Sequence, residues 1–157
     1  MFSDTFKQLL GALGLFLAQW LVLGRLSLWG ATPDVVLLYV AWIGLTRGRL
    51  PAMGAGFALG FLMDVVYQTW GIHMLVKTLI GFLMGLIPPT EREAFNVTPT
   101  QALVGGTVIA LVHNGLLVVL LALQAGVSST TMVTVVWLGA AVYTGAVGTL
   151  AALLRPR

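Results

Sequence analysis

The chain contains no cysteine, and charged residues make up only 8% of its 157 positions. The missing cysteines exclude disulfides, thiolate metal sites and a cysteine nucleophile. The scarcity of charge excludes an ordinary soluble domain, because such domains carry roughly 25% charged residues. The net charge of +3 is small and scattered along the chain, so it does not indicate nucleic-acid binding.

Hydrophobic residues, by contrast, occupy 59% of the chain. A membrane-spanning helix needs about 20 predominantly apolar residues, and six apolar stretches can be drawn along this sequence. We therefore predict an all-α, polytopic membrane protein with six transmembrane helices, forming a single transmembrane domain over residues 1–157. The predicted spans cover residues 6–29, 33–46, 50–67, 72–87, 101–124 and 131–154.

The edges of two spans carry helix-start signals. Pro33 lies where a first-turn proline is tolerated, with Thr32 before it as the predicted N-cap, and Thr98-Pro99 predicts the start of the fifth span. The second span has only about 14 residues, or roughly 21 Å, against a hydrocarbon core of about 30 Å. The sequence leaves open whether this span crosses the membrane fully.

Basic residues are distributed unevenly between the two sides of this arrangement. If the N-terminus is cytoplasmic, six basic residues face the cytoplasm, Arg25 faces the other side, and Lys77 lies within a span. Because cytoplasmic segments carry an excess of Lys and Arg, we expect both termini in the cytoplasm. The six residues are Lys7, Arg47, Arg49, Arg92, Arg155 and Arg157.

Three ionisable side chains fall inside the third and fourth spans. Asp64 and Lys77 lie at similar depths on adjacent antiparallel helices, and His73 lies one helical turn from Lys77 on the same face. We predict that Asp64 and Lys77 form an ion pair that fixes the registry of these two helices. A proton or ion path is one alternative, since ionisable residues within membranes are often functional, and a docking site for a partner helix is another.

Glycines recur every four residues on the same stripes as these charges. Small residues let helix backbones approach closely in a membrane, where lipid supplies no hydrophobic force between helices. The predicted packing glycines are Gly56 and Gly60 on the third span and Gly81 and Gly85 on the fourth.

A second polar spot, His113 and Asn114, lies about halfway along the fifth span. Such side chains often form hydrogen bonds between membrane helices, and a substrate contact is the alternative. No Ser-His-acid set, facing pair of carboxylates, phosphate loop or metal triad can be assembled from the sequence. We therefore predict that the chain is not an enzyme and holds no cofactor or metal.

The second to fourth spans resemble the rod shape-determining protein MreD family. The resemblance rests on PDVVLLYVAWIGLTRGRL, residues 33–50, and GFALGFLMDVVYQTWGIHMLVKTLIGFLMG, residues 56–85. Lys77 departs from the family pattern, where an uncharged residue is expected. The matching positions are Pro33, Asp34, Arg47, Arg49, Gly56, Gly60, Asp64, Gly71, His73, Gly81 and Gly85.

The resemblance implies a structural role in the bacterial inner membrane, within the machinery that elongates the peptidoglycan wall. Proteins of this family associate with MreC, a bitopic protein, and through it with MreB. The wider assembly includes RodA and a class B penicillin-binding transpeptidase. The family fold is similar to the six-helix substrate-binding subunits of energy-coupling-factor transporters, and no catalytic activity is assigned to it.

Two functions from different classes follow. In the first, the chain is a membrane scaffold that docks the transmembrane helix of MreC. In the second, it is a small-solute binding subunit of a transporter. The outer turns are short and carry few charges, whereas a solute site should gather several convergent polar groups, so the sequence favours the scaffold. The sequence leaves open whether the protein binds membrane lipid and whether it associates with a second copy of itself.

Overall fold

The structure is a computed structural model that describes residues 2–87, 97–126 and 129–154. These segments are helical almost throughout, and within them the only extended pairing is an isolated bridge between Leu28 and Ala31. The all-α class predicted from composition is confirmed. Three of the basic residues used to predict orientation, Arg92, Arg155 and Arg157, lie outside the described residues.

The first half of the chain forms four helices. Helix α1, Phe2–Ala18, continues into a short π-helical segment, η1, Gln19–Leu23. After a loop come α2, Val35–Arg47, and α3, Arg49–Tyr67, which are separated by a single residue. Helix α4 then covers Ile72–Met84.

The second half forms a long helical hairpin. Helix α6, Pro99–Ala125, is followed by the π-helical segment η2, Met132–Gly139, which continues into α7, Ala140–Leu153. By length and composition, three helices among the described residues could cross a membrane. They are Arg49–Tyr67, Pro99–Gln124 and Met132–Leu153, while the stretches Leu10–Leu23, Val35–Arg47 and Ile72–Met84 are apolar but shorter.

The first helix ends earlier than the sequence predicted. The predicted span ran to residue 29, but helical structure stops at Leu23 because a tight turn follows. In that turn the backbones of Leu28 and Ala31 exchange two hydrogen bonds of 2.9 Å. Trp29 and Gly30 carry the positive φ angles, 51° and 88°, that close it.

The helix-start predictions had mixed outcomes. Thr98 caps α6 as expected, in a reciprocal capping box with Gln101. The expected N-cap of α2 was wrong: Asp34, not Thr32, caps this helix, and its side chain accepts a hydrogen bond from the backbone of Leu37. An aspartate at this position satisfies one of the N–H groups that a helix start leaves unpaired.

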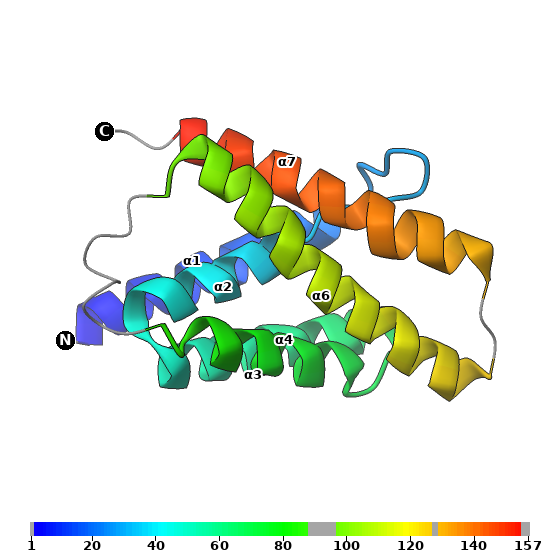
Figure 1. Cartoon of the computed structure of the whole chain (residues 1–157). Coiled ribbons are helices and arrows are strands. Elements are labelled where there is room, and N and C mark those ends of the chain that lie inside the picture. The colour runs from blue at the N-terminus through cyan, green and yellow to red at the C-terminus, as the bar shows by residue number, and fades with distance from the viewer. Residues whose placement is uncertain (1, 88–96, 127–128, 155–157) are drawn as a thin grey trace.

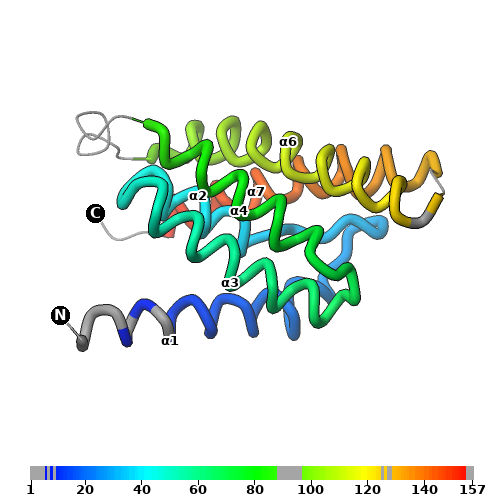
Figure 2. The backbone as a smooth tube through the Cα atoms, turned by 90° about the horizontal axis from the view of Figure 1, so that it is seen from below, coloured from blue at the N-terminus to red at the C-terminus, as the bar shows by residue number. Residues whose placement is uncertain are grey.

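The helices extend between the two ends of the bundle, where the turns lie, and α6 crosses obliquely to the others (Figure 1). The start of α1, the end of α7 and the α2–α3 turn lie at one end. The turns after η1, α3 and α6 lie at the other, as both views show (Figures 1 and 2). Helix α3 packs most extensively on α4, and α6 on α7, while α2 contacts both pairs. Helix α2 is therefore the central element of the bundle.

Candidate functional site

The most buried charge of the described bundle is Lys77 on α4, whose side chain is 0% exposed. Its Nζ donates a hydrogen bond to Oδ2 of Asp34, forming an ion pair between α4 and the start of α2. Lys77 Nζ also lies 3.2 Å from Nε2 of His113 on α6. The lysine thus joins three helices at one point.

Asp34 serves two purposes at once. While Oδ2 accepts from Lys77, Oδ1 accepts from the backbone N–H of Leu37 at 2.8 Å and so caps α2. The backbone N–H of Asp34 donates to Oγ1 of Thr144 at 3.0 Å, which brings α7 into the same network. Thr144 in turn donates to the carbonyl of Ala140 at 2.7 Å.

The loop that leads into Asp34 is held by Gln19 from η1. Its Nε2 donates to the carbonyl of Pro33 at 2.8 Å, and its Oε1 accepts from the backbone N–H of Val35 at 2.9 Å. Gln19 and Thr144 were missed by the sequence reasoning. Each is a buried polar residue within an apolar stretch, which is the signal that could have found them.

The second predicted polar spot belongs to the same network. His113 Nδ1 and Asn114 Oδ1 are 2.8 Å apart, and both side chains are buried. The other ring nitrogen of His113 faces Lys77. His113, Asn114, Lys77 and Asp34 therefore form one buried network, here called the Lys77 network, together with Gln19 and Thr144 on its edges.

Asp64 takes a different role from the one predicted for it. Its Oδ1 accepts from Thr69 Oγ1 at 2.7 Å and from the His73 backbone at 2.9 Å, and its Oδ2 accepts from the Met74 backbone at 2.9 Å. The carboxylate of α3 thus caps the N-terminus of α4, where unpaired N–H groups attract negative charge. The expected Asp64–Lys77 ion pair is not formed, because Lys77 pairs with Asp34 instead.

His73 lies beside this cap without joining the ion pair. Its ring centroid is 5.7 Å from that of Tyr67 and 6.5 Å from that of His113. Its Nδ1 is buried and makes no hydrogen bond within the part of the chain that the structure describes. Gly71, just before α4, has a φ angle of 94°, a conformation that glycine adopts without strain and that lets the chain turn into the helix.

The predicted packing glycines lie where α3 meets α4. A Cβ added to Gly56 would lie 2.5 Å from the Lys77 carbonyl oxygen, and one added to Gly60 would lie 2.5 Å from the Met74 Cα. From the opposite side, a Cβ on Gly81 would lie 2.6 Å from the Ala52 carbonyl oxygen, and one on Gly85 would clash with the Arg49 backbone. These glycines bring the two helices together.

The polar groups of the Lys77 network are engaged with one another. No group of three histidine, cysteine or acidic residues close enough to hold a metal ion occurs among the described residues. Oppositely charged and hydrogen-bonding partners surround Lys77, which is the arrangement that a buried charge requires. What the network can do chemically is hold α2, α4, α6 and α7 in one relative position.

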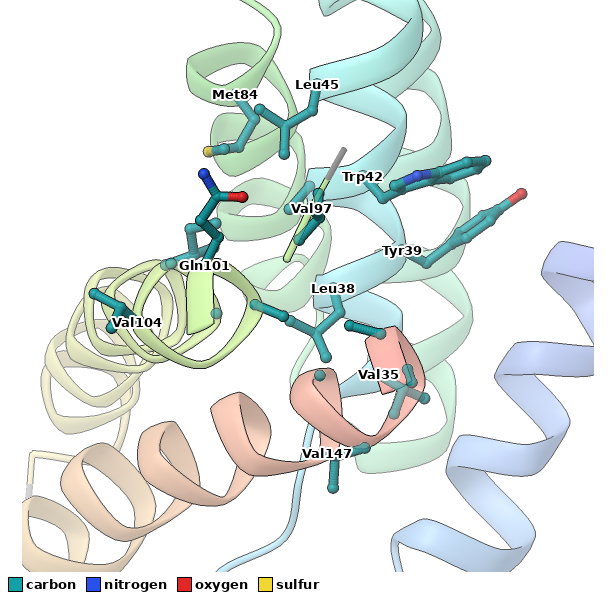
Figure 3. Close-up of a pocket in the computed structure, with 18 of the residues that line it drawn as sticks. Val35, Leu38, Tyr39, Trp42, Leu45, Met84, Val97, Gln101, Val104 and Val147 are labelled. Carbon is teal, nitrogen blue, oxygen red and sulfur yellow. The ribbon is translucent and has the colours of Figure 1, made fainter. Parts of the chain in front are cut away.

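A large apolar groove lies away from this network, toward the end of the bundle where α1 begins and α7 ends. Its volume is about 750 Å³, and it is lined mainly by residues of α2, α6 and α7, with Leu15 from α1. Leu38 points from α2 into the space between α6 and α7, while Tyr39 and Trp42 point toward α1 (Figure 3). Small residues form much of the α6 and α7 walls: Ala102, Gly105, Gly106, Gly148, Ala151 and Ala152.

The fold and the site together define a helical membrane protein that encloses an ion pair among its own helices. A family model described as rod shape-determining protein MreD matches residues 7–150 of the 157. The chain therefore belongs to the MreD family and has a role in rod-shape determination, as the resemblance of the second to fourth spans implied. No curated protein and no solved structure matches it.

Proposed function

We propose that the chain is a non-catalytic scaffold of the bacterial cell-elongation machinery and binds the transmembrane helix of MreC in the large apolar groove. Through MreC it would join the complex that contains MreB, RodA and the class B penicillin-binding transpeptidase. The groove is the observation that carries this proposal. Membership of the MreD family supplies the cellular context.

The walls of the groove suit a helix. Association of helices in a membrane depends on close packing, which small residues permit, and the α6 and α7 walls consist largely of glycine and alanine. An added Cβ at Gly105 meets no atom within 4 Å, so this wall has room for an approaching backbone. The stacked pair Tyr39 and Trp42, with ring centroids 6.2 Å apart, offers a large apolar surface on α2.

The alternative, a solute-binding subunit of a transporter, gains no support from the polar residues. A solute site needs polar groups that are available to the ligand. The charges of Lys77, Asp34 and Asp64 are all satisfied by protein partners. The large groove itself has a lining that is almost entirely apolar.

We further propose that the chain crosses the inner membrane six times, with both termini in the cytoplasm. Two features support this orientation. The start of α1 and the end of α7 lie at the same end of the bundle (Figure 1). Arg47 and Arg49 flank the α2–α3 turn at that end, while Arg25 follows η1 at the other, and basic residues favour the cytoplasmic side.

Gly105→Leu tests the proposed docking. Gly105 lines the large groove and its added Cβ meets no atom within 4 Å, so we expect the leucine to fill the groove, with loss of co-purification with MreC by at least tenfold and with thermal stability kept. Gly14→Leu is the matched control, because Gly14 is an exposed glycine of α1 that also has no atom within 4 Å of an added Cβ and does not line the groove. Both changes replace a helical glycine by a better helix former.

The measurement is the amount of MreC recovered with each tagged variant after gentle detergent extraction. Equal recovery of MreC with wild type, Gly105→Leu and Gly14→Leu would show that the large groove is not the docking site. If the wild-type chain retained no MreC but carried transporter ATPases, the scaffold function itself would be wrong.

A further inference from the structure

A second groove lies on the opposite side of Tyr39, between α1, α2 and α3. Its volume is about 450 Å³, within the range of about 300–1,000 Å³ that is typical of small-ligand sites. Most of its wall is apolar, and Arg47 is its one charged lining residue. We call it the Arg47 groove; its lining includes Gln8, Ala12, Tyr39, Arg47, Ala58 and Leu62.

The Arg47 side chain has no partner within the part of the chain that the structure describes. It is exposed, and it makes no hydrogen bond or ion pair with any described residue. Arg47 is the last residue of α2, beside the turn into α3. An unpaired guanidinium at one end of an apolar groove is suited to a ligand with an anionic head and an apolar tail, since arginine binds phosphate through paired N–H donors.

The length of the groove matches one leaflet of a bilayer. Its α3 wall runs from Pro51 to Leu62, and the eleven residue-to-residue steps between them span roughly 16 Å along the helix. Half of a hydrocarbon core of about 30 Å is roughly 15 Å. Arg47 therefore lies where a lipid headgroup would be, and Ala58 and Leu62 lie at the depth of its acyl chain.

From this geometry we infer that the Arg47 groove binds one anionic glycerophospholipid, with the lipid phosphate on the Arg47 guanidinium and an acyl chain along α1 and α3. Arginine near a membrane surface attracts anionic lipids electrostatically. The apolar wall of the groove contacts the acyl chain of the lipid, and the Arg47 guanidinium favours a negatively charged headgroup. This site is separate from the large groove, so the inference does not depend on the binding of MreC.

The test compares lipids retained by the purified chain in native mass spectrometry. The probes are dioleoyl phosphatidylglycerol and dioleoyl phosphatidylcholine, supplied in equal amounts in mixed micelles. We expect wild type to retain the anionic lipid at least fivefold over the zwitterionic one, and Arg47→Gln to lose this preference. Arg49→Gln is the matched control, because Arg49 is also an exposed cation beside the α2–α3 turn but does not line the groove.

A second variant tests the position of the acyl chain. An added Cβ at Gly54, another lining residue, meets no atom within 4 Å, so we expect Gly54→Leu to fill the groove and abolish retention of both lipids. Three results would overturn the inference: no headgroup preference in wild type, equal loss of preference in Arg47→Gln and Arg49→Gln, or full retention by Gly54→Leu.

Discussion

At the scale of single residues, the buried Lys77 pairs with Asp34 at the start of α2 and not with Asp64 of α3. The similar depth of Lys77 and Asp64 on neighbouring helices predicts a pair between these two residues. In the structure the Asp64 carboxylate already accepts from two backbone N–H groups at the start of α4 and from the Thr69 hydroxyl in the turn before it. Asp34 reaches Lys77 because α2 also packs against α4. The depth of residues within the third and fourth spans does not indicate this contact with the second.

The Asp34–Lys77 pair makes each partner necessary for the other. Removing one partner from a buried ion pair leaves an uncompensated charge and typically costs about 3–5 kcal/mol. Here the same carboxylate also caps α2, so loss of Asp34 would affect both the ion pair and the start of the central helix.

At the scale of helices, the close approach of α3 and α4 depends on the glycines between them. Gly60→Ala would place a methyl group 2.5 Å from the Met74 Cα and 2.7 Å from the His73 carbonyl oxygen. Because backbone atoms cannot yield without moving the helix, we expect a loss of stability of about 1–3 kcal/mol. The measurement is thermal or denaturant unfolding of the variant in detergent.

Gly54→Ala is the control for this prediction. Gly54 lies on the same helix, but its added Cβ meets no atom within 4 Å. Alanine has the higher helix propensity, so this variant should be as stable as wild type or slightly more so. Equal destabilisation by Gly54→Ala and Gly60→Ala would show that the α3–α4 contact does not require small residues.

The sequence predicted helices better than it predicted their ends and contacts. Apolar stretches and spacing by four located the helices and placed Gly56, Gly60, Gly81 and Gly85 on facing stripes. The early end of the first helix was missed, because Leu26 and Leu28 continue the apolar pattern through a turn. The π-helical segments were also missed, since composition does not distinguish them from α-helix.

The candidate site was predictable only in part. Lys77, His113 and Asn114 are conspicuous as polar residues in apolar spans, and the structure brings them together. Their partner Asp34 was identified only as part of a family motif. Neither groove could be foreseen, because each arises where three or more helices meet, and periodicity within one helix does not describe that arrangement.

At the scale of the whole molecule, the absence of cysteine permits a direct test of orientation. Trp29 is 98% exposed in the loop after η1, and Arg49 is exposed at the opposite end of the bundle. With both termini cytoplasmic, Trp29→Cys should react with a membrane-impermeant maleimide in intact cells, and Arg49→Cys only after permeabilisation. The reverse pattern would invert the proposed orientation.

The Lys77 network is expected to hold the bundle together through Asp34. The most direct measurement is a double-mutant cycle on unfolding free energy in detergent. It compares Asp34→Asn, Lys77→Met and the double variant; asparagine keeps an N-cap oxygen, so the first change removes mainly the charge. We expect a coupling energy of about 1–3 kcal/mol between these two sites.

The same cycle with Asp64→Asn in place of Asp34→Asn provides the comparison. Because Asp64 caps α4 and does not pair with Lys77, its effect should add to that of Lys77→Met within about 0.5 kcal/mol. Strong coupling of Lys77 to Asp34 together with additivity at Asp64 is the predicted result. If the effects of Asp34→Asn and Lys77→Met on unfolding free energy were additive, while those of Asp64→Asn and Lys77→Met were strongly coupled, Asp34 would not be the partner through which Lys77 stabilises the bundle.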